Sequence, residues 1–203
     1  MLERGAVVGF SLIECMIACI VFALLCLMAL PSFTSAIQDA QVRTAAQSLA
    51  SSLQLARAES IRRNTSVQLL FTNELGRRPV PGGTDWKILA DDQSTPGLPH
   101  YVREVQLRSG LEGSPQARVG ARTTNNFSTP ASPGANLPGA VTFSSLGRLT
   151  APSGASSTPI IQIDVVHAIN PKARRLSISL TPGGQIRLCD PVISIAVNPQ
   201  GCA

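Results

Sequence analysis

Apolar residues dominate the N-terminal part of the chain. Every residue from 15 to 30 is apolar, and the run begins at Phe10, with only Ser11 and Glu14 as polar interruptions. A helix needs about 20 mostly apolar residues to cross the hydrocarbon core of a bilayer. The pattern over residues 10–30 therefore predicts a membrane-spanning helix.

A cleaved secretory signal is the alternative explanation for this run. Such a signal has a shorter apolar core, which a small-x-small cleavage site follows. Here the run is longer and ends in Ala29-Leu30-Pro31-Ser32, which offers no such site before a polar start. Glu14 is a further argument, because a carboxylate inside a membrane helix costs about 2.5–3.5 kcal/mol on insertion scales. A charge at that cost requires a partner or a function.

The helix is predicted to continue to about Asn64 with an amphipathic pattern. Small or apolar residues recur at helical spacing, and beyond Pro31 no Gly or Pro interrupts them. This stripe contains Leu49, Leu53, Ala56 and Ser60, with Ala46 and Ile61 beside it. The polar face contains Gln41, Arg43, Gln47, Gln54, Arg57 and Glu59. Such a helix packs one face on a sheet, and the Arg62-Arg63 pair at its end is interpreted as complementing the helix dipole.

The remaining sequence is typical of β structure. Short runs rich in branched side chains are separated by Gly, Pro, Asn and Asp. We expect strands over residues 67–71, 86–90, 102–107, 141–143, 160–166, 176–180 and 186–189. Clean alternation at 161–165 and 176–180 indicates half-buried antiparallel strands. Residues 110–139 have little apolar periodicity and many turn residues, which predicts a long surface loop.

The five cysteines fall into two groups. Cys15, Cys19 and Cys26 lie in the apolar helix, where cysteine behaves as a small apolar residue. Cys189 and Cys202 lie in the β-rich part that follows the helix, and in an oxidising compartment we expect them to form a disulfide. A metal site is the alternative, but two cysteines without a nearby His or a CxxC spacing make a poor zinc site.

The sequence offers no recognisable catalytic site. Neither His100 nor His167 has a spaced acid or nucleophile as a partner, and the glycine motifs of phosphate-binding loops and nucleophile elbows are missing. The Asp91-Asp92 pair is interpreted as a solvated acidic turn. We therefore expect no enzyme activity, no catalytic residue, no metal and no cofactor.

The N-terminus resembles that of type IV pilins and pseudopilins. The resemblance rests on the apolar helix, on Pro31 and on the motif Gly9-Phe10-Ser11-Leu12-Ile13-Glu14. In that family a prepilin peptidase cuts after the glycine, so the resemblance implies a leader of residues 1–9 and cleavage between Gly9 and Phe10. It further implies N-methylation of Phe10, pairing of Glu14 with the terminal amine of a neighbouring subunit, and a helix bend at Pro31.

The proposed pairing has a physical rationale. An amine and a carboxylate that are each costly in lipid cost less when they form a pair within a helix bundle. A plain single-span anchor with an idle acidic residue is the alternative.

Two further segments resemble the GspH/FimT branch of minor pilins and minor pseudopilins. They are residues 55–64, at the end of the long helix, and the motif Phe143-Ser144-Ser145-Leu146-Gly147-Arg148, whose glycine is expected in a turn. The implied fold class is α+β: a type IV pilin-like roll whose long N-terminal helix packs on antiparallel sheets. Its parts are a leader (1–9), an assembly helix (10–31), an amphipathic half-helix (32–64) and a β-rich head (65–203) with the loop at 110–139 and a disulfide-closed tail.

The resemblance implies a minor type IV pilin, a structural subunit that primes assembly of a pilus or lies at its tip. The implied partners are other major and minor pilins, the prepilin peptidase and the inner membrane, with the head in the periplasm before the subunit joins the fibre. A minor pseudopilin of a type II secretion system is an alternative that the sequence leaves open.

A second alternative is a pilin that binds double-stranded DNA during natural transformation. The net charge of +5 and the isoelectric point near 9.3 favour attraction to phosphate. The family's DNA-binding members carry Gly-Arg-x-Arg where this chain has Gly184-Gln185-Ile186-Arg187, so only one arginine matches. The candidate DNA-binding residues are Arg148, Lys172, Arg174, Arg175 and Arg187. Arginines on the outer face of a solvated hairpin are the structural alternative.

Overall fold

A computed structural model describes residues 11–72, 82–93, 100–110, 112–137, 139–152 and 158–202. The described residues form one continuous helix, α1 (Leu12–Arg63), followed by nine β-strands. It divides into two compact units, Met1–Ile37 and Gln38–Ala203. The helix contributes to both units, which we describe separately.

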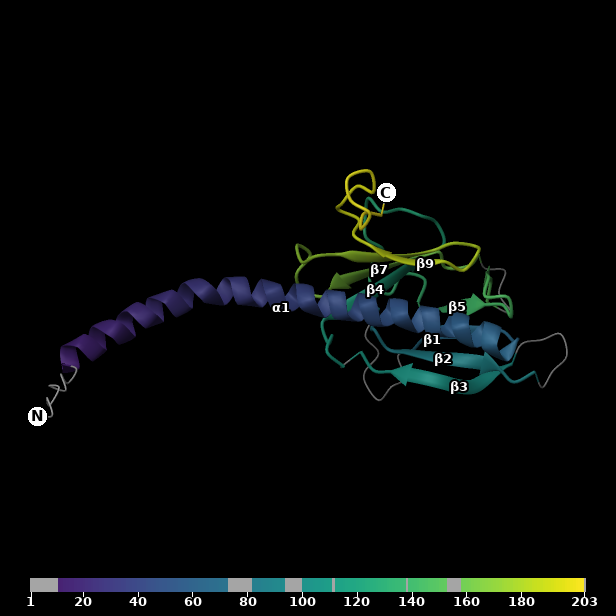
Figure 1. The fold of residues 1–203 in the computed structure, drawn as a ribbon, viewed down its shortest axis with the longest axis horizontal. Coiled ribbons are helices and arrows are strands. Elements are labelled where there is room, and N and C mark those ends of the chain that lie inside the picture. Colours follow the sequence, from purple (N-terminus) through teal and green to yellow (C-terminus); the bar gives the residue numbers. More distant parts are fainter. Residues whose placement is uncertain are drawn as a thin grey trace, which may run out of the picture. The chain divides into compact units, whose positions relative to one another are not determined.

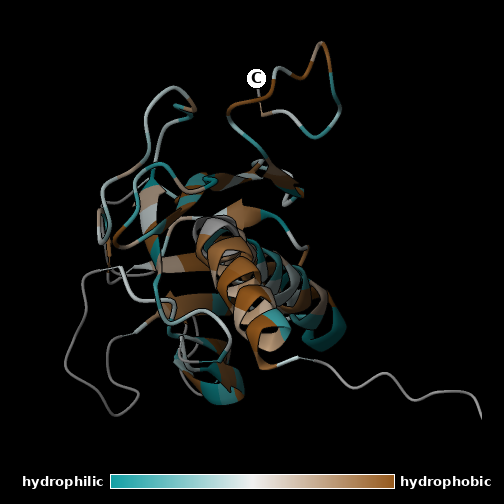
Figure 2. Ribbon diagram, turned by 90° about the vertical axis from the view of Figure 1, so that its left-hand side faces the viewer, coloured by the Kyte–Doolittle hydropathy of each residue, from teal (hydrophilic) through white to brown (hydrophobic). Residues whose placement is uncertain are grey.

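The first unit is the N-terminal part of α1, and its large apolar side chains are exposed. They include Leu12, Ile17, Phe22 and Leu27, and Figure 2 shows this part of the helix as mostly hydrophobic. The side chains of residues 28–32 lie outside the described part of the structure. Within the described part, no helix is long and apolar enough to cross a membrane. The membrane span expected over residues 10–30 stays a prediction.

In the second unit, α1 buries one stripe of small and apolar residues. Four residues of the expected stripe are at most 3% exposed, namely Ala46, Leu49, Leu53 and Ala56, and they share one core with both sheets. Ile61 was expected beside the stripe, but its side chain is 52% exposed. Ser60, the preceding residue, is fully buried. Successive side chains of a helix point about 100° apart, so the Ile61 side chain points away from the core.

The helix ends where the sequence predicts. Asn64 has a φ of 52°, and the backbone amide of Thr65 donates to the carbonyl of Ser60 at 3.2 Å. A left-handed residue after the last turn, with an amide that bonds back into it, is a common way to satisfy the last carbonyls of a helix.

Two antiparallel sheets form the rest of the head (Figure 1). The first has the strand order β3-β2-β1-β5-β6 and the second β4-β7-β8-β9. The first sheet consists of β1 (Val67–Phe71), β2 (Trp86–Asp91), β3 (Tyr101–Arg108), β5 (Ala140–Phe143) and β6 (Leu149–Thr150). The second consists of β4 (Ala117–Arg122), β7 (Gln162–His167), β8 (Leu176–Leu180) and β9 (Ile186–Cys189). The seven expected strands are all present, with ends shifted by up to two residues.

The expectation of a loop without strands over residues 110–139 is wrong, because β4 lies within it. This strand pairs with β7 at six positions, from Ala117 with His167 to Arg122 with Gln162. Its sequence, Ala-Arg-Val-Gly-Ala-Arg, is poor in the branched and aromatic residues that mark strands. The chain that follows β4 returns across the strand at Gly120, where a Cβ would lie only 2.4 Å from the carbonyl oxygen of Ser132. This close approach leaves no space for a larger side chain at that position. The short strand β6 was also not predicted.

Candidate functional site

The residues expected to direct assembly lie at the N-terminus. Gly9 and Phe10 are outside the described residues. Glu14 lies in the first turn of α1 with an exposed side chain, where the helix dipole favours a negative charge. Residue Pro31 lies inside the helix, which continues through it. The roles expected for these residues stay predictions.

The disulfide expected from the sequence is present between Cys189 and Cys202. It closes the C-terminal tail on the end of β9. The backbone amide of Asp190 donates to the carbonyl of Gln200 at 2.7 Å, and that of Cys202 donates to the carbonyl of Asp190 at 3.2 Å. Apolar residues Val192 and Val197 are exposed in the tail. The tail is therefore an ordered loop that is tied to the sheet at both of its ends.

The candidate basic residues do not form one free cationic surface. Arg187 donates to the carbonyls of Pro199 and Gly201 at 2.8 and 2.7 Å. Arg174 pairs with Asp190 at 2.9 Å, and the Arg175 guanidinium donates to the carbonyl of Phe127. Two arginines thus hold the tail and the third holds a loop. Sequence reasoning missed these contacts because each joins residues that are distant along the chain.

The other two candidate basic residues have exposed side chains. Arg148 lies in the turn between β5 and β6, and Lys172 lies in the loop between β7 and β8. They are the members of the predicted set that are best placed to meet a phosphate from solvent.

The turn between β5 and β6 confirms the expected role of the Phe143-to-Arg148 motif. Phe143 is fully buried, whereas Gly147 has a φ of 70°. The Gly147 carbonyl accepts a bond of 3.1 Å from Nε of Arg57, on the helix. Arg57 was expected on a solvated face, but it is half-buried and connects the helix to this turn.

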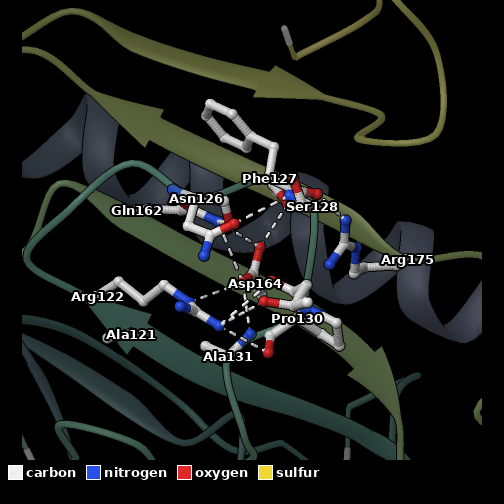
Figure 3. Close-up of polar contacts among 12 residues, drawn as sticks. Ala121, Arg122, Asn126, Phe127, Ser128, Pro130, Ala131, Gln162, Asp164 and Arg175 are labelled. Carbon is white, nitrogen blue, oxygen red and sulfur yellow. Dashed lines mark hydrogen bonds and ion pairs between the residues drawn. The ribbon is translucent and has the colours of Figure 1, made fainter.

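A buried polar cluster around Asp164 was not expected from the sequence (Figure 3). Asp164 and Gln162 are both fully buried on β7, although the strand alternation predicted a solvated polar face. The Asp164 carboxylate accepts bonds from the amide of Ala131 at 2.7 Å, from Nε2 of Gln162 at 3.0 Å and from the hydroxyl of Ser177. The Arg122 guanidinium lies 3.8 Å away.

The cluster fixes the chain between β4 and β5 on the second sheet. Gln162 donates to the carbonyl of Asn126 at 2.8 Å and accepts from its amide at 2.6 Å. A buried carboxylate is stable only when its oxygens are hydrogen-bonded. All these partners come from β7 itself, from its neighbouring strands or from the chain that they hold, which makes the cluster structural.

The residues considered for catalysis or metal binding make local polar contacts. The Asp91 carboxylate accepts bonds from the amides of Gln93 and His100 at 3.1 and 2.8 Å. Nδ1 of His167 accepts bonds from the amides of Ile169 and Asn170 at 3.3 and 3.1 Å. Nδ1 of His100 lies 3.3 Å from Asp92 at an exposed position. Among the described residues, no group of three or more His, Cys, Asp or Glu side chains could hold a metal ion.

Comparison with known proteins identifies the family. The sequence model described as "Type II transport protein GspH" matches residues 45–201, which include most of the head. This chain belongs to the GspH family. The family contains minor pilins and minor pseudopilins, and the expected α+β fold with a helix packed on antiparallel sheets is confirmed.

Two solved structures resemble this GspH-family chain. The type IV minor pilin FimU of Pseudomonas aeruginosa is 14% identical, with a TM-score of 0.48 over 80% of this chain and 95% of FimU. The minor pseudopilin EpsH of Vibrio cholerae is 12% identical, with a TM-score of 0.44 over 74% of this chain and 98% of EpsH. A comparison with curated proteins gives no match.

Proposed function

We propose that this GspH-family chain is a minor type IV pilin, a structural subunit that primes assembly of a pilus or lies at its tip. The observation that carries the proposal is the contrast along one helix. Large apolar side chains are exposed at positions from Leu12 to Leu27, whereas Val42 to Ala56 bury a single stripe in the head. A helix that is apolar all round is stable when lipid or other helices surround it.

The proposed route to the fibre begins in the inner membrane. Residues 10–31 anchor the subunit there, with the head in the periplasm. A prepilin peptidase removes residues 1–9, and the new terminus at Phe10 is methylated. Glu14 then pairs with the terminal amine of a neighbouring pilin, which lowers the cost of both charges in an apolar surrounding.

Mass spectrometry of fibres sheared from the native host tests this proposal. We expect a terminal peptide that begins with N-methylated Phe10. A Gly9→Val variant should keep its leader and stay out of the fibres, while the matched leader variant Gly5→Val should be processed. A chain in the fibres that begins at Met1, or a chain missing from every fibre fraction, contradicts the proposal.

A type II secretion pseudopilus is the alternative assembly, and the description of the matching family favours it. The two assemblies are distinguished by deleting the chain in its host. Loss of surface pili with normal protein secretion supports the minor pilin. Loss of secretion with normal pili supports the pseudopilin.

DNA binding is a second candidate function, which the net charge of +5 and the exposed Arg148 and Lys172 favour. Binding through these residues predicts a shift of duplex DNA at low salt that the double variant Arg148→Ala, Lys172→Ala removes. Arg174, Arg175 and Arg187 support the fold, so their substitution would confound binding with stability. A shift that the double variant leaves unchanged argues against a defined site.

A further inference from the structure

A polar groove lies between α1 and the first sheet, within the head. Its volume is about 380 Å³. One wall is a face of α1 with Ser48, Ser51, Ser52 and Leu55. The other wall is formed by β2, β3 and the residues after β3, which lie along the helix in Figure 1, and it presents Trp86, Gln106, Leu107, Arg108 and Glu112.

The strand register places two buried residues with N–H donors side by side in the wall of this groove. Trp86 and Arg108 are paired residues of β2 and β3 and therefore share one face of the sheet. Trp86 is 1% exposed and Arg108 is 9% exposed. Buried donors of this kind normally have an acceptor.

Each of the two side chains has a donor atom without a partner among the described residues. They are Nε1 of Trp86 and Nη1 of Arg108. The other terminal nitrogen of Arg108, Nη2, donates to the carbonyl of Glu112 at 2.6 Å. The two donors need an acceptor that the described residues of the head do not supply.

The charge of Arg108 is incompletely balanced. Among the described residues, its nearest carboxylate is that of Glu112, which lies 3.9 Å from Nε, and the Glu112 side chain is 68% exposed. Burial lowers the pKa of the Arg108 guanidinium, and the Glu112 charge offsets this only in part.

The serines on the α1 side of the groove offer hydrogen-bond acceptors but few free donors. The hydroxyl of Ser51 donates to the carbonyl of Gln47 at 2.9 Å, and that of Ser52 donates to the carbonyl of Ser48 at 2.7 Å. Both hydroxyl protons are thus used within the helix. A ligand of the groove must therefore bring acceptors and negative charge for Trp86 and Arg108.

We propose that this groove binds a carboxylate group, with Arg108 and Trp86 as its donors. An arginine offers two aligned N–H groups to the two oxygens of a carboxylate, and hydrogen bonds to charged acceptors are the stronger kind. The carboxylate belongs to a small organic acid or to an acidic residue of a peptide. The site lies in the head and does not depend on the proposed assembly helix.

The sole tryptophan of the chain, Trp86, makes binding directly measurable. The full-length chain in detergent micelles, labelled with ¹⁵N, gives one indole N–H resonance. We expect sodium glutarate, and the peptide acetyl-Gly-Glu-Gly-amide, to shift this resonance in a saturable way. Sodium chloride at the same ionic strength and the peptide acetyl-Gly-Gln-Gly-amide should not. If glutarate saturates the shift at a lower concentration than the acidic peptide, the ligand is a small acid. If the acidic peptide saturates it at a lower concentration, the ligand is a protein segment.

Two variants test the groove itself. Arg108→Gln should abolish the saturable shift. Because this residue is buried and its substitution can unfold the head, Gln106→Glu provides a second test at an exposed position. It places a negative charge in the groove and should weaken binding about tenfold or more, whereas Gln185→Glu, which adds the same charge at the exposed β8–β9 turn, should not. A resonance that glutarate and the acidic peptide leave unmoved, or that responds equally in the Gln106→Glu variant, overturns the proposal.

Discussion

Gly184 and Gly147 lie in contact although they belong to turns of different sheets. A Cβ on Gly184 would lie 1.9 Å from the carbonyl oxygen of Gly147, and that same oxygen accepts the bond from Arg57 of the helix. The amide of Leu149 also donates to the carbonyl of Pro182, in the turn that contains Gly184, at 3.1 Å. The helix, the edge of the first sheet and a turn of the second sheet therefore meet at one point.

Gly184→Ala tests this contact. The residue has a φ of 81° and no space for a side chain, so we expect the free energy of unfolding to fall by about 2 kcal/mol or more. Urea denaturation measures the change. Gly183→Ala is the matched control, because a Cβ there would meet only the Thr181 hydroxyl, at 3.9 Å. Equal stability of the two variants would show that the turns do not pack as described.

Asp164→Asn tests the buried polar cluster. The substitution places an amide N–H₂ group among donors that already point at the carboxylate, so we expect a loss of about 2–4 kcal/mol of stability. Hydrogen exchange of the Ala131 amide should become faster, because that amide donates to Asp164. Ser177→Ala removes one bond only and should cost about 1 kcal/mol. Unchanged exchange at Ala131 in Asp164→Asn would contradict the assigned role.

Reduction of the Cys189–Cys202 disulfide should lower the stability of the head by about 3 kcal/mol, because the two cysteines are 13 residues apart and the bond restricts the unfolded chain. Denaturation with and without a reductant measures the difference. The denatured, unreduced full chain should titrate as three free thiols, from Cys15, Cys19 and Cys26. Five titrating thiols would rule out the bond.

Glu59 predicts a pH dependence at the end of the helix. Hydrogen bonds from Arg62 and Arg63 lower the pKa of its carboxyl to about 2. A lowered pKa stabilises the fold above the unfolded value near 4.5, and this stabilisation is lost as the pH falls toward 2. Since the arginines are partly exposed, we expect about 1 kcal/mol.

The variant Glu59→Gln isolates this contribution. It should be less stable than the unsubstituted chain at pH 6, and the difference should disappear near pH 2 in urea denaturation. If the stability difference between the two chains stays constant from pH 6 to pH 2, the charge of the Glu59 carboxylate is not its source.

The sequence was sufficient for the parts of the fold that periodicity determines. The stripe from Ala46 to Ala56 is buried where the pattern predicts, and so are the apolar residues of β8, but Ser177 on the expected polar face of that strand is buried as well. Strand β4 escaped prediction because its close approach to the returning chain requires Gly120 and small alanines rather than branched residues. The strand propensities of the β4 residues contain no information about this contact with a distant part of the chain.

The candidate sites were less predictable, because their chemistry depends on contacts between distant residues. Arg187 was interpreted as a free cation, but it holds the tail. Asp164 was assigned to a solvated face, but residues from 126 to 131 cover it. The pairing of Trp86 with Arg108 depends on the register of β2 and β3, which no local pattern specifies.

The central claim, that this chain is a fibre subunit joined through its N-terminal helix, is tested most directly by Glu14→Ala. The variant should stay in the membrane fraction, and its amount in sheared fibres should fall about tenfold or more, since it cannot neutralise the amine of its neighbour. Glu104→Ala, at an exposed position of β3, is the matched control and should enter fibres normally. Glu14→Ala in fibres at the unsubstituted level would contradict the account.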